Sequence, residues 1–97
     1  MKVSGVILAA GLSRRMGFPK ALLRWDEETY LDRLIRLFSG VCAEVIVVLR
    51  PEAVLDECRR LGEARVVYNQ DADRGQLSSL QTGLAAVTGD AVLFSPV

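Results

Sequence analysis

Short apolar runs that alternate with helical patterns are the feature that most constrains the fold of this chain. We expect strands at Val3–Leu8, Glu44–Leu49, Arg65–Tyr68 and Ala91–Phe94. Their near-continuous Val, Ile and Leu content is typical of strands that are covered on both faces. Strands alternating with helices favour βαβ units and a parallel sheet. The pattern therefore predicts an α/β fold with helices on both faces of a mostly parallel sheet.

Two helices are expected before the third strand. The first is predicted at Tyr30–Ser39, with Thr29 and Asp32 as a capping box and Gly40 at its end. The second is predicted to cover about residues 51–61, because a proline suits its first position and a glycine follows its last one. Each has apolar residues along one side, as a helix that covers a sheet requires.

A third helix is expected to begin near Ser78 or Ser79 and to end at Gly89. Its apolar stripe is predicted to consist of Leu80, Leu84 and Val87. Gly83, inside this helix, costs about 1 kcal/mol relative to alanine. We therefore expect Gly83 to allow close packing against a neighbouring element, with a close approach to a ligand as the alternative.

Composition limits the chain to one compact domain and excludes several kinds of chemistry. The 97 residues are 51% hydrophobic, and the 12 basic and 12 acidic residues cancel. A balanced charge gives no reason to expect a nucleic acid or a membrane as partner. Because histidine is absent, histidine zinc sites and Ser-His-Asp or Cys-His arrangements are excluded.

The cysteines and the first residues favour a cytoplasmic protein. Cys42 and Cys58 are expected to be reduced thiols in or near the core. Residues 1–8 contain one basic residue and a short apolar run, which does not fit a signal peptide, and no stretch is apolar enough for a membrane helix.

The segment LAAGLSRRMGFPKALL, residues 8–23, joins the end of the first expected strand to glycines and cations. Glycines let the backbone approach a ligand closely, while Arg and Lys side chains bind phosphate oxygens. The spacing of Gly11, Gly17 and Lys20 differs from that of a P-loop, and no G-x-G-x-x-G sequence is present. The segment predicts a phosphate-binding loop of another kind.

This segment resembles the signature of the MobA-like NTP transferase family, L-A-A/G-G-x-S-x-R-M-G-x-x-K. A second segment, NQDADRGQLSSLQTG at residues 69–83, is similar to the family pattern N-x5-G-x-x-x-S-L-x-x-G. The resemblance implies a Rossmann-like three-layer α/β/α sandwich with the nucleotidyltransferase fold. It also implies that residues 1–97 are the N-terminal, nucleotide-binding portion of one such domain.

The resemblance also implies roles for residues of the first motif. Arg15 would hold the β- and γ-phosphates, and Lys20 would neutralise charge that develops at the α-phosphate; these two are the candidate catalytic residues. Arg14 lies at a position that the family pattern leaves free. The nucleotide-binding candidates of this motif are Leu8, Ala9, Ala10, Gly11, Ser13, Arg15 and Lys20.

In the second motif, the candidates for nucleotide binding are Asn69, Gly75 and Ser79. Asn69 follows the third expected strand, where an amide can contact a base or a ribose, although an asparagine there can equally form a turn. Gly75 and Ser79 would direct the N-terminus of the third helix toward the nucleotide, or Ser79 would simply cap that helix. Asp71 and Asp73 fit turn positions better than a metal site.

The implied reaction transfers a nucleoside monophosphate from an NTP to a small phosphorylated acceptor such as molybdopterin, releasing pyrophosphate. The LAAG spelling, together with the SSLQTG segment, is most similar to the cytidylyltransferase branch of the family, which implies CTP as the nucleotide. The family uses Mg²⁺, but the Asp-x-Pro sequence that supplies its ligand is absent from AVLFSPV, residues 91–97. We therefore expect no metal ligand in this chain and no turnover by it alone.

Two other functions remain open from the sequence. One is a nucleotide-binding or interaction module without turnover, and the other is a transferase for sugar phosphates or alcohol phosphates. The apolar last strand also predicts a tendency to self-associate, because an uncovered strand can pair with another copy.

Overall fold

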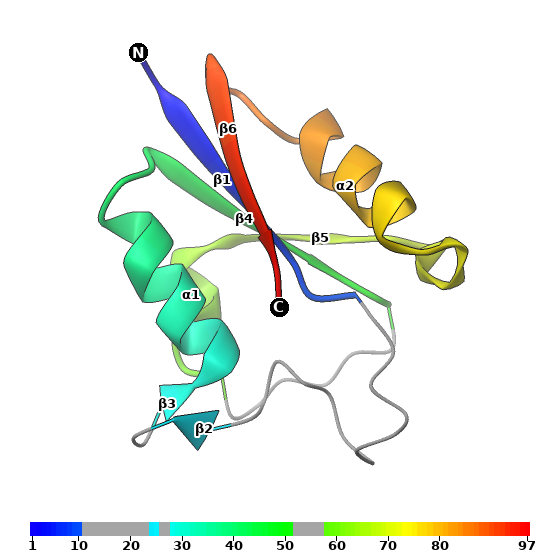
Figure 1. The fold of residues 1–97 in the computed structure, drawn as a ribbon, viewed down its shortest axis with the longest axis horizontal. Coiled ribbons are helices and arrows are strands. Elements are labelled where there is room, and N and C mark those ends of the chain that lie inside the picture. The colour runs from blue at the N-terminus through cyan, green and yellow to red at the C-terminus, as the bar shows by residue number, and fades with distance from the viewer. Residues whose placement is uncertain (11–23, 26–27, 52–57) are drawn as a thin grey trace.

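A four-stranded parallel sheet forms the centre of the structure (Figure 1). The computed structural model describes residues 1–10, 24–25, 28–51 and 58–97. The sheet contains β1 (Val3–Leu8), β4 (Glu44–Leu49), β5 (Arg65–Tyr68) and β6 (Ala91–Pro96), in the spatial order β5-β4-β1-β6. All three pairings are parallel. The expected parallel sheet is confirmed, and its last strand continues past Phe94 to Pro96.

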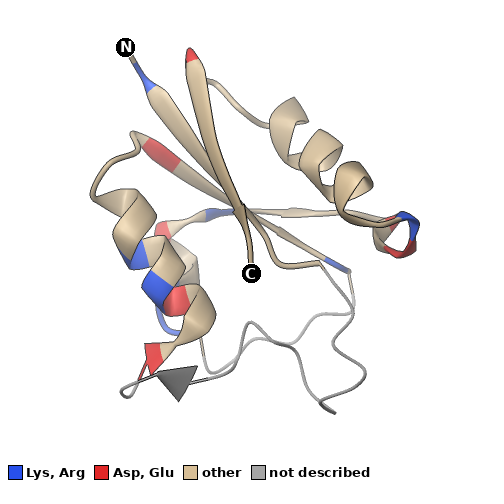
Figure 2. Cartoon of the chain, viewed as in Figure 1, with Lys and Arg blue, Asp and Glu red and all other residues tan. Residues whose placement is uncertain are grey.

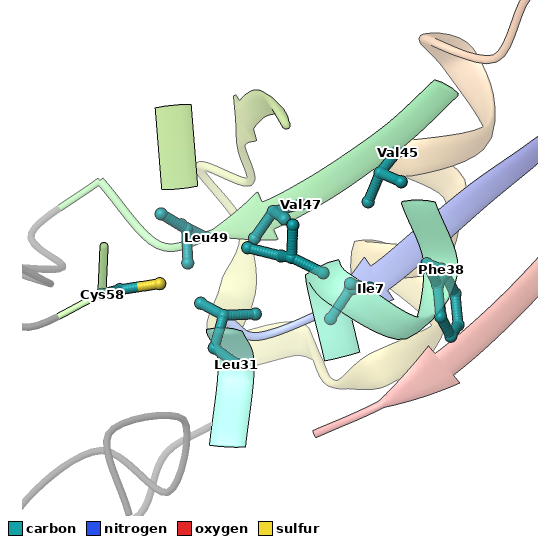
Figure 3. Packing of buried hydrophobic residues seen from close by; sticks show 8 residues of the cluster. Ile7, Leu31, Phe38, Val45, Val47, Leu49 and Cys58 are labelled. Atoms are coloured by element: carbon teal, nitrogen blue, oxygen red, sulfur yellow. The ribbon is translucent and has the colours of Figure 1, made fainter. Parts of the chain in front are cut away.

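Two helices cover opposite faces of this sheet. Helix α1 (Tyr30–Ser39) and helix α2 (Gln76–Ala85) lie on either side of the strands (Figure 1). Alternate strand residues serve the two faces, because successive side chains point in opposite directions. Ile7, Val45, Val47 and Leu49 pack with Leu31, Ile35 and Phe38 of α1 (Figure 3), whereas Val6, Leu8, Ile46 and Val48 pack with Leu80 of α2. The three-layer α/β/α arrangement is therefore confirmed.

Helix α1 has the predicted bounds. The backbone N–H of Asp32 donates to Thr29 Oγ1 at 3.0 Å, so Thr29 is the N-cap, and Gly40 is the C-cap. The Asp32 carboxylate does not behave as in the predicted capping box. It accepts hydrogen bonds from Cys58 Sγ at 2.9 Å and from the backbone N–H groups of Arg59 and Arg60 at 3.1 and 2.8 Å.

These contacts explain why the predicted second helix is wrong over its last residues. Residues 58–60 form a turn, and a short 3₁₀ helix covers Leu61–Glu63, so Gly62 lies inside it and does not end a helix. The N–H groups of residues 59 and 60 are bound by the Asp32 carboxylate, so they do not make the bonds of an α-helix. Residues 52–57 lie outside the described part of the chain.

Helix α2 begins and ends earlier than predicted. Gly75, with φ of 101°, is its N-cap, so the helix begins at Gln76, ahead of Ser78 and Ser79. Its C-cap is Ala86, so Val87 lies beyond the helix although it still packs on the core. Leu84 of the predicted stripe is 44% exposed. The buried side of α2 instead includes Gly83.

Close packing at Gly83 is confirmed. A Cβ added there would lie 2.6 Å from Val6 Cγ1 and 3.1 Å from Val48 Cγ2. The glycine therefore lets α2 approach β1 and β4 more closely than any other residue would.

One element was not predicted from the sequence. It is a small antiparallel hairpin, β2 (Arg24–Trp25) with β3 (Glu28–Thr29), which precedes α1. Strand β6 is the outer strand beside β1, and its Val92, Leu93 and Phe94 are 38, 44 and 53% exposed.

The helices found in the described ranges are all too short or too polar to cross a membrane.

Candidate functional site

The carboxyl ends of β1, β4 and β5 bring the candidate residues together. Ala9 and Ala10 follow β1, Arg50 follows β4, and Asn69 follows β5. In open parallel sheets, ligands bind beyond this edge of the strands. The candidates of both sequence motifs that the structure describes therefore lie at the edge where a ligand is expected.

The end of β1 is held by backbone hydrogen bonds to both neighbouring strands. The Leu8 carbonyl accepts from the N–H of Val97 at 3.1 Å, and the Ala9 N–H donates to the Val48 carbonyl at 2.9 Å. Leu8 and Ala10 are buried. These contacts fix the point at which the chain enters the first motif.

Asn69 organises the turn that leads from β5 into α2. Its side chain is 4% exposed, and Nδ2 donates to Ser78 Oγ at 2.9 Å and to Ser79 Oγ at 3.0 Å. Oδ1 accepts from the backbone N–H of Asp71 at 2.9 Å. The structure thus brings Asn69 and Ser79 together. Ser79 is itself buried inside α2, so it does not cap that helix.

This network places the N-terminus of α2 near the carboxyl edge of β5. Gly75 provides the left-handed backbone conformation that turns the chain into the helix, and Ser78 Oγ donates to the Gly75 carbonyl at 2.8 Å. The N-terminus of a helix presents unpaired N–H groups and a partial positive charge, which favours anions. Asp71 takes part in the turn at Asn69, as the sequence predicted.

Arg50 is a residue at this edge that the sequence analysis missed. Its Nε donates to the Ala10 carbonyl at 3.0 Å, and its Nη1 lies 3.2 Å from Asp73 Oδ1. Arg50 therefore connects the backbone at the start of the first motif to the turn of the second motif. The available signal was its position, directly after a buried strand, where polar residues face the ligand side of the sheet.

Four candidates of the first motif, Gly11, Ser13, Arg15 and Lys20, lie outside the described residues. Their roles stay predictions. In the ranges that the structure does describe, no three Asp, Glu or Cys side chains come together in a way that could hold a metal ion.

The cysteines are free, as expected. Cys58 is buried and Cys42 is half-buried. Burial, followed by the neighbouring Asp32 carboxylate, raises the pKa of Cys58 to about 12, so this thiol is not a nucleophile at neutral pH. Burial raises the pKa of Asp32, but the hydrogen bonds from Cys58, Arg60 and Arg59 outweigh it, and the net shift is downward. The hydrogen bonds of Asp32 with Cys58, Arg59 and Arg60 connect α1 to the turn before β5. We therefore assign both residues a structural role.

Charges of both signs are interspersed over the described chain (Figure 2), in keeping with a formal net charge of zero. Attraction for an anion must therefore come from local groups such as Arg50 and the N-terminus of α2.

Solved structures with the same architecture are nucleotidyltransferases. The chain is 29% identical to a nucleotidyl transferase from Methanothermobacter thermautotroptrophicus, with a TM-score of 0.81 over 98% of this chain and 50% of that one. It is also 29% identical to 2-C-methyl-D-erythritol 4-phosphate cytidylyltransferase from Thermus thermophilus, with a TM-score of 0.74 over 99% of this chain and 41% of that one. The fold is thus the nucleotidyltransferase type of α/β sandwich, as predicted.

Within that class, the family model of the MobA-like NTP transferase domain matches residues 5–97, and the chain belongs to this family. Curated relatives include proteins named probable molybdenum cofactor guanylyltransferase from Bacillus cytotoxicus, 27% identical, and from Bacillus mycoides, 25% identical. The matches cover 97 and 98% of this chain but 48% of each relative. The chain spans about half the length of the curated relatives it matches.

Proposed function

We propose that this chain forms the nucleotide-binding portion of a nucleotidyltransferase. The observation that carries the proposal is the position of LAAGLSRRMGFPK, which begins at the buried end of β1 on the carboxyl edge of the sheet. An acceptor phosphate oxygen attacks the α-phosphorus of the NTP, the bond from that phosphorus to the bridging oxygen breaks, and pyrophosphate leaves. Binding and charge neutralisation supply the catalysis.

The residues of the chain take the following parts in this proposal. Leu8, Ala9, Ala10 and Gly11 meet the nucleobase and ribose, and the backbone amides from Ala10 to Ser13 face the phosphate oxygens. Hydrogen bonds of Leu8 and Ala9 fix the backbone at the start of this segment. Arg15 and Lys20 bind the phosphates. Asn69, Gly75 and Ser79 direct the N-terminus of α2 toward the phosphates. The bonds from Asn69 Nδ2 to Ser78 and Ser79 support this role.

The acceptor is proposed to be molybdopterin, and the base is either cytosine or guanine. The LAAG spelling favours CTP, whereas the names of the curated relatives favour GTP. A titration of the chain with both nucleotides decides between them. An alcohol phosphate is a second candidate acceptor, because one of the similar structures is a cytidylyltransferase named for such a substrate.

Residues 1–97 are proposed to be part of one MobA-like domain that acts in the cytoplasm with Mg²⁺. We propose that these residues bind nucleotide but do not complete the transfer alone, because residues 91–97 lack the Asp-x-Pro sequence to which the resemblance assigns the metal ligand. Self-association is proposed through β6, where Val92, Leu93 and Phe94 are exposed. Sedimentation that shows a monomer at high concentration would contradict this last point.

The first test compares Lys20→Ala with Arg14→Ala by calorimetric titration of CTP and GTP. We expect the Lys20 variant to weaken binding by about tenfold, because it removes a charged contact to phosphate, and the Arg14 variant to change it little. Equal effects would contradict the assigned roles. Pyrophosphate release with molybdopterin, measured against Lys20→Ala as background, separates a competent enzyme from a binding module.

A further inference from the structure

Arg50 is a largely covered cation at the edge of the sheet where the nucleotide is proposed to bind. Its side chain is 14% exposed, whereas that of its partner Asp73 is 79% exposed. The guanidinium is oriented from one side by the bond from Nε to the Ala10 carbonyl. On its other side, Nη1 meets the Asp73 carboxylate at 3.2 Å.

The contacts of Arg50 with Ala10 and with Asp73 differ in strength and permanence. The Ala10 carbonyl belongs to the chain at the end of β1, which is bonded to β4 and β6. Asp73 lies in the 3₁₀ turn Ala72–Arg74, and its side chain is exposed to solvent. An ion pair with such an exposed carboxylate contributes little free energy. A phosphate oxygen, which carries more charge and suits a guanidinium well, can replace it.

We propose that Arg50 is an anion-binding residue of the nucleotide site. Its guanidinium binds a phosphate oxygen of the triphosphate while Nε stays on the Ala10 carbonyl, and Asp73 is the counter-ion that the phosphate displaces. This inference rests on the proposed function, which supplies the triphosphate. It adds a cation that directly follows β4 to those of the first motif, which all come from the segment after β1.

The alternative is that Arg50 only ties the two motifs together through Asp73. The substitution Asp73→Asn separates the two roles because it removes the charge while it keeps the shape of the side chain. If Asp73 competes with phosphate, D73N binds the triphosphate about threefold more tightly. If the ion pair is needed to hold the site, D73N binds it more weakly.

Arg50→Ala and Arg50→Lys complete the set. Loss of a charged hydrogen bond to phosphate predicts binding about tenfold weaker for R50A, whereas R50K keeps the charge and recovers part of the loss. Arg60 and Glu63 offer a matched control, since their ion pair also measures 3.2 Å but joins the N-cap to the last residue of the 3₁₀ helix before β5. R60A and E63Q are expected to leave binding unchanged.

The experiment is a calorimetric titration of each variant with CTP, GTP and tripolyphosphate, with thermal unfolding measured alongside. Tighter binding by D73N together with weaker binding by R50A supports the proposal. Weaker or unchanged binding by D73N, or unchanged binding by R50A, overturns it. R50K serves as a second variant in case R50A does not fold, because it keeps the positive charge. A folded R50K variant that binds no better than R50A would also overturn the proposal.

The same titrations separate this inference from the proposed function. Nucleotide binding that depends on Lys20 but not on Arg50 would retain the proposed function and remove Arg50 from the site. If the chain binds tripolyphosphate through Arg50 but binds neither CTP nor GTP, Arg50 is an anion-binding residue and the proposed nucleotide-binding function is wrong.

Discussion

The two edges of the parallel sheet are built from similar polar groups, yet they differ in how those groups are satisfied. At the amino edge, the hydroxyl of fully buried Ser4 donates to the Glu44 carboxylate, which also accepts from the N–H and hydroxyl of Thr88 at 2.8 and 2.7 Å. The Gly89 N–H donates to Ser4 Oγ at 2.9 Å. This network joins β1, β4 and the segment that leads into β6.

At the carboxyl edge, the polar groups connect loops instead of strands. Asn69 holds the start of α2, and Arg50 reaches from the Ala10 carbonyl to the exposed carboxylate of Asp73. A hydrated counter-ion can be exchanged for a ligand, whereas the partners of Ser4 and Glu44 are neighbouring parts of the fold. If the proposed site is correct, changes at the amino edge should alter stability alone, while changes at the carboxyl edge should also alter binding.

The largest expected effect at the amino edge is that of Gly89→Ala. A Cβ there would lie 2.5 Å from Ser4 Oγ and 2.7 Å from the Lys2 carbonyl oxygen, so the backbone must move. We expect a loss of about 3 kcal/mol in the free energy of unfolding, measured by urea titration. Nucleotide affinity of the folded protein should not change, and weaker binding would contradict the separation of the two edges.

Gly62→Ala is the control for this substitution. A Cβ at Gly62 meets nothing within 4 Å. The free energy of unfolding should therefore change by less than about 0.5 kcal/mol.

The next largest effect is that of Asn69→Ala, which should lower both the stability of the fold and the affinity for nucleotide. The substitution leaves the buried Ser79 hydroxyl and the Asp71 N–H without the amide partner, which costs about 2 kcal/mol of stability. It also frees the N-terminus of α2, so we expect nucleotide affinity to fall about tenfold by calorimetry. The neighbouring exposed Gln70, changed to alanine, is the control. Unchanged affinity in N69A would show that α2 does not serve the site.

Glu44→Gln should have a smaller effect that depends on pH. The Ser4 hydroxyl, followed by the N–H and hydroxyl of Thr88, lowers the pKa of Glu44 to about 2 from 4.5. The ionised carboxylate therefore stabilises the fold above pH 4.5, and this contribution is lost as the pH falls toward 2. We expect E44Q to lose about 1 kcal/mol at neutral pH.

The measurement is urea unfolding of wild type and E44Q across this pH range. The difference between the two proteins should shrink steadily below pH 4.5. A difference that stays constant down to the lowest pH would mean that the charge of Glu44 does not contribute.

The sequence was sufficient to predict the sheet and α1, because those elements depend on local patterns. The apolar runs located each strand of the parallel sheet, with only the end of β6 predicted too early, and Thr29 and Gly40 marked the ends of α1 correctly. The residues between β4 and β5 could not be predicted in the same way. Their apolar spacing suits a helix, but the carboxylate of Asp32, distant in sequence, binds the N–H groups of residues 59 and 60.

For the candidate site, the sequence placed Asn69 at the carboxyl end of its strand, where the structure has it, but did not reveal how the candidates are connected. Asn69 and Ser79 were predicted to serve one site, and the structure brings them into contact. Arg50 was missed because its partners Ala10 and Asp73 lie on different segments, so no local motif contains the three. The start of α2 was placed too late because Gly75, with its positive φ, replaces a serine cap.

Lys2→Ala should have the smallest effect, and it tests what holds the amino edge together. Lys2 Nζ donates to Thr88 Oγ1 at 2.7 Å, but this contact is exposed. The backbone of Lys2 makes the connections that reach β6: its N–H donates to Asp90 Oδ2 at 3.0 Å, and its carbonyl accepts from the N–H of Asp90 at 2.7 Å. Alanine keeps both backbone contacts, so the free energy of unfolding should fall by about 0.3 kcal/mol.

Thr88→Val is the matched comparison, because it removes the hydroxyl that binds Glu44 and should cost about 1 kcal/mol in the same urea titration. A larger loss for K2A than for T88V would mean that surface charge stabilises this edge. If T88V loses more stability than K2A, as we expect, added salt should hardly change the contribution of the amino edge to the free energy of unfolding. Binding of a triphosphate at the carboxyl edge, which depends on cations, should weaken as salt increases.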